Sequence, residues 1–162
     1  MAIKIKKFAA AAIAVCFLVL TVLSCAGSAA AKAANFSDII DKDWVLEEIQ
    51  IGQTIIHINR AADISEVYTI RFEADRLGGT AAPNRYFSPY TAEGANSISI
   101  GMVGSTMMAP LFERNDLAEN RYFLFLEKVF RWELNNEKLE LFSVDESGNE
   151  AKLIYSDKMI FQ

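Results

Sequence analysis

From Trp44 onward the chain is dominated by short apolar segments separated by turn residues. In residues 67–72 apolar and polar side chains alternate, so Tyr68, Ile70 and Phe72 share one face of an extended strand. A period of two is the pattern of a strand that buries one face, and it does not suit a helix. This region is therefore predicted to consist mainly of antiparallel strands.

Turn residues divide the β region into many strands. Gly52-Gln53, Asn135–Lys138 and Asp145–Glu150 are turn sequences, and the strand at Arg76–Ala81 has glycines in place of side chains. The predicted strands are residues 44–51, 54–58, 67–72, 76–81, 97–100, 104–108, 132–134, 139–142, 151–155 and 159–161. The first two form a hairpin, and together the strands form a meandering sheet of about eight to ten short strands.

One segment, at about residues 116–130, has the period of a helix instead. It opens with a capping residue, Asn115, and acidic residues, and Lys128 lies near its end, as helix start and stop preferences require. Its apolar face consists of Tyr122, Phe123, Leu126, Val129 and Phe130. The sequence thus predicts an α+β fold, mainly antiparallel β, with one amphipathic helix packed on the sheet.

The N-terminus has the pattern of an export signal. Lys4, Lys6 and Lys7 precede an apolar run over residues 8–23, and small residues follow. The run is shorter than the roughly 20 residues that a membrane-spanning helix needs. Residues 1–25 are therefore predicted to be a signal peptide, and we expect the protein to be exported to the cell envelope, in the periplasm or at the outer membrane.

Two processing routes are open at the end of this signal. Val22–Cys25 resembles a bacterial lipobox, in which Cys25 is diacylated and becomes the mature N-terminus. Ala31–Ala33 fits ordinary signal cleavage. We favour a lipid anchor on Cys25, because this residue lies directly where the apolar run ends. Residues 26–40 then form a flexible tether to a domain over residues 41–162.

Charge and cysteine content exclude some classes of function. No cysteine follows Cys25, so the domain must be stabilised by its core rather than by disulfides. Without the three signal lysines, 13 basic residues face 21 acidic ones, a net charge of about −8. The arginines are scattered and form no basic stripe. We therefore expect no nucleic-acid partner, because phosphate attraction needs clustered Lys and Arg.

Several motifs together resemble one known family. Trp44–Leu46 is a first-strand Trp-x-Leu, Ala82–Tyr86 aligns with a Gly-Cys-Asn-x-Tyr pattern, and Ser105–Pro110 aligns with Ser-Thr-x-Met-Ala-Cys. A leucine-rich hairpin follows the helix. In these features the chain, over about residues 43–161, resembles the META-domain family, which includes the HslJ-type envelope proteins of bacteria.

In this chain both cysteines of the family pattern are replaced by proline, Pro83 and Pro110. The resemblance implies that a disulfide or redox role of those cysteines does not transfer, and we expect the two prolines to lie close together. It also implies a curled, partly open antiparallel barrel with the helix across or inside it, similar to small lipoproteins that escort secretins to the outer membrane. Envelope stress, drug tolerance and secretion are associated with the family, and no catalytic residue comes with the resemblance.

The mature chain offers few groups for catalysis or metal binding. His57 is its single histidine and is predicted to be a strand residue that faces solvent or the barrel rim. A zinc site needs three or four ligands, and one histidine with no free cysteine does not provide them. Asp145–Glu150 is rich in oxygen ligands but lacks the ligand spacing of a calcium loop. Gly101–Thr106 lacks the ending of a phosphate loop. Neighbours such as Glu47 and Glu48 face opposite ways in a strand, so they do not form a pair of catalytic carboxylates. We expect no catalytic residue, metal site or cofactor.

The segment Gly78–Tyr90, GGTAAPNRYFSPY, is interpreted as a corner of a curled sheet. Paired glycines mark a bend or a close approach of another backbone, and Pro83 interrupts the hydrogen-bond ladder. The alternative, a cradle for a ligand, has less support because one Asn-Arg-Tyr cluster is weak evidence for a pocket. If a binding site exists, its candidate residues are Asn84, Arg85, Tyr86, Tyr90, Ser105 and Thr106.

These observations lead to a non-enzymatic, monomeric envelope lipoprotein that binds a protein or peptide partner at exposed strand edges. The rival is a carrier whose half-barrel encloses a small apolar ligand. An enzyme is third. A deep apolar cavity beneath the helix would favour the carrier, whereas a filled core with an open apolar edge would favour partner binding.

Overall fold

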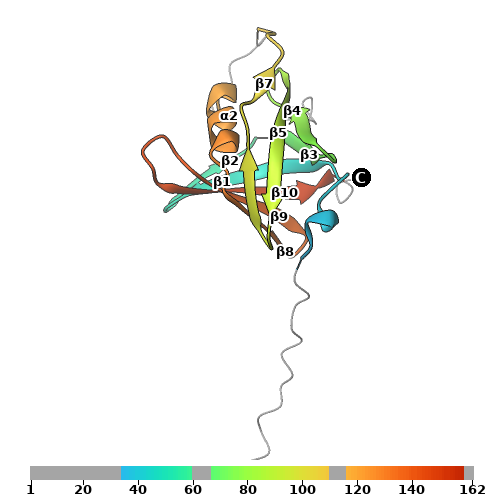
Figure 1. Cartoon of the computed structure of the whole chain (residues 1–162). Helices are drawn as coiled ribbons and strands as arrows, with labels where there is room; N and C mark the ends of the chain where they lie inside the picture. The colour runs from blue at the N-terminus through green and yellow to red at the C-terminus, as the bar shows by residue number, and fades with distance from the viewer. Residues whose placement is uncertain (1–33, 60–66, 110–115, 159–162) are drawn as a thin grey trace, which may run out of the picture. The chain divides into compact units, whose positions relative to one another are not determined.

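The computed structural model describes residues 34–59, 67–109 and 116–158 (Figure 1). They form ten strands, one α-helix and one short 3₁₀-helix. In chain order these are η1 Phe36–Asp38, β1 Trp44–Ile51, β2 Thr54–His57, β3 Thr69–Phe72, β4 Arg76–Thr80, β5 Arg85–Glu93, β6 Ser97–Ile100, β7 Gly104–Ser105, α2 Glu119–Glu127, β8 Arg131–Asn135, β9 Lys138–Val144 and β10 Glu150–Asp157. The predicted mainly antiparallel α+β fold is confirmed.

The strands form one sheet that curls into a barrel. Its order is β10-β9-β8-β6-β5-β4-β3-β1-β2, and a further pairing of β10 with β1 closes the strands from β10 to β1 into a ring. A β-bulge between Leu46 and Glu48 interrupts that pairing, and bulges of this kind bend a strand as curling requires. Strand pairing around the ring is least extensive between β6 and β8, which share the single residue pair Ser97 and Arg131.

Two short strands branch from the ring. The first half of β1 pairs with β3 and its second half pairs with β2, on the same side of β1. In the same way, β5 pairs with β7 through Tyr86 and Phe87 and with β6 through residues 90–93. In the part of the chain that the structure describes, β2 and β7 are therefore each paired on one side only.

The interior of the barrel is packed with aliphatic and aromatic side chains. The largest fully buried side chains include Trp44, Trp132, Tyr68, Tyr122, Tyr155, Phe72 and Phe125. The buried Trp44 indole N–H donates to the Ile39 carbonyl at 3.0 Å. Helix α2 contributes Tyr122, Phe125 and Leu126 to this core.

The helix is shorter than the sequence predicts. It begins at Glu119, after Ala118 in the N-cap position with no side-chain cap, and it ends at Glu127. Because the helical period stops there, Phe130 falls outside the helix and is 46% exposed, so its predicted place on the buried face is wrong. Phe125, which the predicted face omitted, is buried instead.

The folded unit begins at Ala34 rather than at residue 41. Asn35 caps η1 in a capping box with Asp38, and the Phe36 ring contacts Phe72, Tyr90 and Trp132 at centroid distances of 5.6, 5.6 and 5.3 Å. The last residues of the predicted tether thus belong to the domain. Residues 26–35 of the tether have no large apolar side chain, and the few at its end, Phe36, Ile39 and Ile40, were not a sufficient signal.

Strand boundaries differ in the middle of the chain. Residues 85–93 form the nine-residue strand β5, which the sequence interpretation treated largely as a corner, while the predicted strand 104–108 is reduced to β7. Pro89 lies inside β5 where its pairing passes from β7 to β6, so its missing N–H breaks no continuous ladder. The predicted strand 159–161 lies outside the described residues.

Among the described residues, no helix has the length and apolar character needed to span a bilayer. The predicted signal peptide and its Cys25 lie outside the described residues.

Candidate functional site

The corner predicted in residues 78–90 is the turn of a β-hairpin. Strands β4 and β5 pair from Arg76 to Pro89, and a turn with a cis Ala82–Pro83 peptide bond connects them. Asn84 closes this turn, since its carbonyl accepts from the Ala81 N–H at 2.6 Å. Pro110, the predicted neighbour of Pro83, lies outside the described residues, and the expected proximity of the two stays a prediction.

Asn84 is buried and its side chain joins three segments. Its Oδ1 accepts from the Thr106 hydroxyl at 2.8 Å and from the Met108 N–H at 2.7 Å. Its Nδ2 donates to Glu119 Oε2 at 2.7 Å and to the Met108 carbonyl at 3.3 Å. The Asn84 N–H also donates to Glu119 Oε1 at 3.0 Å. Asn84 thereby fixes the hairpin turn, the segment after β7 and the first turn of α2 relative to one another.

Gly79 confirms the predicted close approach of another backbone. A Cβ atom added at Gly79 would lie 1.9 Å from the carbonyl oxygen of Thr69 in β3 and 2.9 Å from the Tyr86 hydroxyl. No larger residue fits there without separating these strands. Gly78 is less constrained, with its nearest contact at 3.3 Å. The approaching backbone belongs to β3 rather than to the helix.

Three tyrosine hydroxyls form a chain behind this hairpin. The Tyr86 hydroxyl donates to the Thr69 carbonyl at 2.7 Å and lies 3.0 Å from the Tyr122 hydroxyl, which lies 3.2 Å from the Tyr155 hydroxyl. Burial raises the pKa of all three phenols, because a phenolate is poorly solvated in the core. These perturbed groups lie in the packed interior and belong to the core cluster.

The structure brings five of the six candidate residues together. Tyr86 pairs with Ser105 across β5 and β7. The Arg85 N–H donates to Thr106 Oγ1 at 3.2 Å, and the Arg85 carbonyl accepts from the Thr106 N–H at 3.0 Å. Asn84 joins them through Thr106. Arg85, Ser105 and Thr106 are exposed, whereas Asn84 and Tyr86 are buried.

The sixth candidate, Tyr90, lies apart from the others. It is in the second half of β5, where it pairs with Ile100. Its hydroxyl donates to the Glu73 carbonyl at 2.6 Å, and its ring contacts Phe36 and Phe72. Tyr90 therefore supports the end of the barrel where the chain enters the domain.

Sequence reasoning missed the exposed apolar residues beside β7. Phe87, Met102, Met107 and Met108 are 61, 84, 100 and 61% exposed. The Phe87 ring lies over Gly104, where an added Cβ would meet the ring at 3.0 Å. We call these four side chains together with β7 the β5–β7 edge; β7 lies at the top of Figure 1. Alternation along β5, with Tyr86 inward, could have placed Phe87 outward.

A small pocket lies elsewhere, between α2 and the β9–β10 turn. It has a volume of about 140 Å³ and is lined by Arg121, Leu124, Phe125, Lys128, Val144, Asp145, Glu146 and Ser147. Ligand sites commonly occupy about 300–1,000 Å³, so this pocket is small for one. The turn itself is held by the Asp145 carboxylate, which accepts from the side chain and the N–H of Asn149 and from the Ser147 N–H, and these bonds lower the pKa of Asp145.

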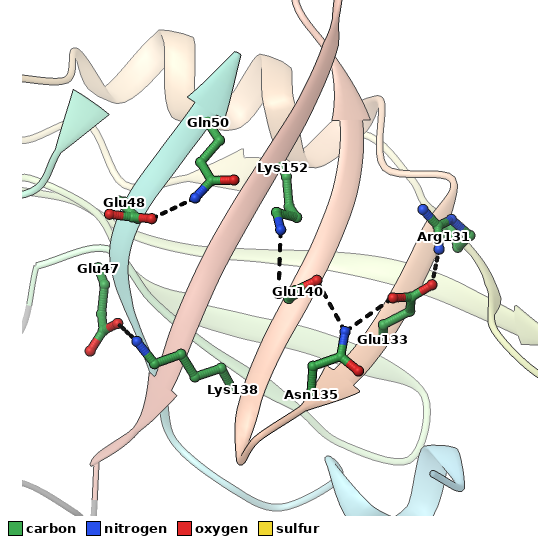
Figure 2. Close-up of polar contacts among 9 residues, drawn as sticks. All are labelled: Glu47, Glu48, Gln50, Arg131, Glu133, Asn135, Lys138, Glu140 and Lys152. Carbon is green, nitrogen blue, oxygen red and sulfur yellow. Dashed lines mark hydrogen bonds and ion pairs between the residues drawn. The ribbon is translucent and has the colours of Figure 1, made fainter. Parts of the chain in front are cut away.

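The outer face of β1, β8, β9 and β10 carries paired polar side chains (Figure 2). Lys138 bonds Glu47 at 2.7 Å, Lys152 contacts Glu140 at 3.4 Å, and Arg131 pairs with Glu133. We call this region the polar face. His57, on β2, is 74% exposed and lies 3.1 Å from Glu48, which agrees with its predicted place on a solvent-facing strand. Among the described residues, no group of three or more His, Cys, Asp or Glu side chains could hold a metal ion.

Comparison with known proteins identifies the family. Residues 34–157 match the META domain. The chain belongs to the META domain family. A solved structure, described as the NMR structure of the protein from Burkholderia xenovorans, shares the fold with a TM-score of 0.57 at 20% sequence identity, covering 75% of this chain and 85% of that one. No curated protein matches this chain.

Proposed function

We propose that this META domain protein is a non-enzymatic bacterial envelope lipoprotein, anchored through Cys25 and HslJ-like, whose β5–β7 edge binds an extended segment of a partner protein. The observation that carries the proposal is the exposure of Phe87, Met102, Met107 and Met108 around a strand that is paired on one side in the described residues. Exposed apolar side chains gathered in one place mark interaction sites, whereas scattered ones are ordinary.

An extended peptide suits this edge for two reasons. A one-sided strand offers its backbone to another strand, and the apolar side chains beside it provide contacts for alternate side chains of the added segment. Methionine side chains are flexible and polarizable, so they adapt to different apolar partners. The hydrogen bonds of Asn84 with Thr106 and Met108 hold the segment after β7 in place before a partner arrives.

Charge narrows the chemistry of the partner. The chain has 21 acidic and 16 basic residues. The net negative charge of the chain would repel an acidic segment and attract a basic one, and it would not oppose a neutral one. We therefore propose a neutral or basic segment with apolar side chains at alternate positions.

The filled barrel favours partner binding over the carrier hypothesis. A carrier needs an internal apolar cavity, but Trp44, Trp132, Tyr68, Tyr122 and Tyr155 are fully buried in mutual contact with the core. The pocket beside α2 is small, and charged residues line part of it. The groups with strongly raised pKa are core tyrosines rather than residues of a cleft, which lends no support to an enzyme.

Site-specific photo-crosslinking in cells tests the proposal. A photo-crosslinking amino acid replaces Phe87 in one variant and Lys138, on the polar face, in another. We expect a recurrent envelope protein from position 87 only, with the crosslink mapped by mass spectrometry to an extended apolar segment. A synthetic peptide of that segment should compete for the crosslink.

Matched substitutions control for non-specific capture. Met107→Asp in the β5–β7 edge should reduce capture from position 87 by about tenfold or more, as loss of an interface anchor does. Ile55→Asp changes an equally apolar exposed residue on β2, the other one-sided strand, and should leave capture unchanged. Equal capture from positions 87 and 138, or equal effects of the two aspartates, would refute the proposed site.

A further inference from the structure

The methionines of the described chain are concentrated in one short segment. Met102, Met107 and Met108 all lie within residues 102–108, and all three are exposed. None of them belongs to the core cluster, where methionine usually serves as an apolar filler. Met1 and Met159 lie outside the described residues.

We infer that these three methionines are a reversible oxidation site for peroxides and hypohalous acids, and that oxidation turns the β5–β7 edge from apolar to polar while the barrel stays folded. The susceptibility of a thioether follows its exposure, and the sulfoxide product is polar and disrupts methionine-rich interfaces. The consequence for partner docking rests on the proposed function, but the oxidation itself does not.

The chemistry balances with one equivalent of hydrogen peroxide. The thioether sulfur attacks one peroxide oxygen, so an S–O bond forms while the O–O bond breaks. The leaving hydroxide takes the proton of the transferred hydroxyl, which gives a sulfoxide and water. Sulfur loses two electrons and peroxide gains them, so no further reductant is consumed. Methionine sulfoxide reductases reverse the change.

The geometry explains why the fold tolerates this change. Met107 is fully exposed and Met102 nearly so, so an added oxygen meets solvent. The hydrogen bonds that hold Met108 use its backbone N–H and carbonyl with Asn84, and not its side chain. The structure therefore orders the reaction rates as Met107 first, Met102 second and Met108 last.

The test treats the purified full chain with hydrogen peroxide and quantifies the sulfoxide at each methionine by peptide mass spectrometry. We expect oxidation of all three in the order given, at rates within about tenfold of those in the urea-unfolded chain. The thermal unfolding midpoint should change little, while retention on a hydrophobic-interaction column falls. Protection beyond tenfold, or unfolding on oxidation, would overturn the inference.

A triple variant, Met102→Leu, Met107→Leu and Met108→Leu, is the control because leucine keeps the apolar surface but cannot form a sulfoxide. Its column retention should respond to peroxide much less than that of the parent chain, and an equal response would overturn the inference. In cells, oxidation should lower crosslinking from position 87 about tenfold in the parent chain and not in the variant. If crosslinking from position 87 captures no partner even without oxidant, the proposed function fails while the oxidation result still stands on the column and the mass spectra.

Discussion

The polar face and the β5–β7 edge are both exposed to solvent, yet they are built in opposite ways. On the polar face, β1, β9 and β10 pair with strands on both sides, and their outward side chains pair with each other, as Lys138 does with Glu47. At the β5–β7 edge, β7 has two residues and a partner on one side among the described strands, and exposed apolar side chains lie on β5 and in the segments before and after β7.

The two surfaces differ in whether they discourage or favour association with other chains. Paired charges on a sheet discourage association with other chains and contribute little to stability. Exposed apolar residues at a one-sided strand favour association, and they are tolerated because the strand is short and fixed by Asn84, Thr106 and Glu119. Stability near the edge should therefore depend on what lies beneath it, while substitutions on the polar face should have small effects.

The largest effect is expected from Gly79→Ala, because the new Cβ would overlap the Thr69 carbonyl in β3. We expect a loss of about 3–5 kcal/mol in the free energy of unfolding, or failure to fold. Urea titration of this variant beside Gly78→Ala, whose neighbour is at 3.3 Å, provides the comparison. If the two variants unfold at the same urea concentration, the close approach does not exist.

A pair of asparagines compares the two regions directly. Asn84→Ala removes a buried side chain that bonds Thr106, Met108 and Glu119, and should cost about 2–4 kcal/mol. Asn135→Ala removes bonds to Glu133 and Glu140 on the polar face, and should change stability by less than about 0.5 kcal/mol. Equal losses in thermal or urea unfolding would contradict the contrast between the regions.

The tyrosine chain beneath the hairpin predicts an alkaline loss of stability. Burial raises the pKa of Tyr86, Tyr122 and Tyr155 in the folded state, so above pH 10 the unfolded chain loses protons that the folded chain keeps. The contribution of these tyrosines to the free energy of unfolding is therefore constant below pH 10. Above pH 10 the free energy of unfolding falls by about 1.4 kcal/mol per pH unit for each such tyrosine.

Tyr122→Phe is the corresponding test. It removes the central hydroxyl, and at neutral pH it should cost about 1–3 kcal/mol because the Tyr155 hydroxyl loses the bond it makes with Tyr122. Between pH 10 and 12 the free energy of unfolding should fall less steeply with pH than in the parent, by about 1.4 kcal/mol per pH unit, because one tyrosine fewer releases its proton on unfolding. An unchanged slope would show that Tyr122 does not titrate with unfolding.

The smallest effect is expected on the polar face. Glu47 and Lys138 are partly exposed and 2.7 Å apart, and the pairing raises the pKa of Lys138 through the hydrogen bond with Glu47. A double-mutant cycle with Glu47→Gln and Lys138→Met should give a coupling of less than about 1 kcal/mol that fades in high salt. A coupling of several kcal/mol that resists salt would mean that this face stabilises the barrel as strongly as the hairpin does.

Local pattern was sufficient to predict much of the fold. Alternation placed Ile70 and Phe72 in the core, and turn residues located the hairpins at residues 52–53, 136–137 and 145–149. The sequence also indicated the close approach at Gly79. These features depend on residues that are close in the sequence or on the size of a single residue, and both can be read from one sequence.

Long-range features could not be predicted in the same way. The burial of Asn84 depends on Glu119, which is 35 positions away and carries no local signal for that contact. The place of Phe36 in the domain depends on its contacts with Phe72 and Trp132, which are distant in the sequence. The exposure of Met107 depends on β7 being the outermost strand, a property of sheet order rather than of residues 104–108.

We propose that β7 accepts a strand from a partner. The most direct measurement is an NMR titration of the domain with the synthetic segment recovered by crosslinking, monitoring backbone amide shifts and hydrogen exchange. We predict that shifts and slowed exchange concentrate at Gly104 and Ser105 and at neighbouring Phe87, with none on β8, β9 or β10. Changes centred on the polar face, or spread through the core tyrosines, would contradict the account.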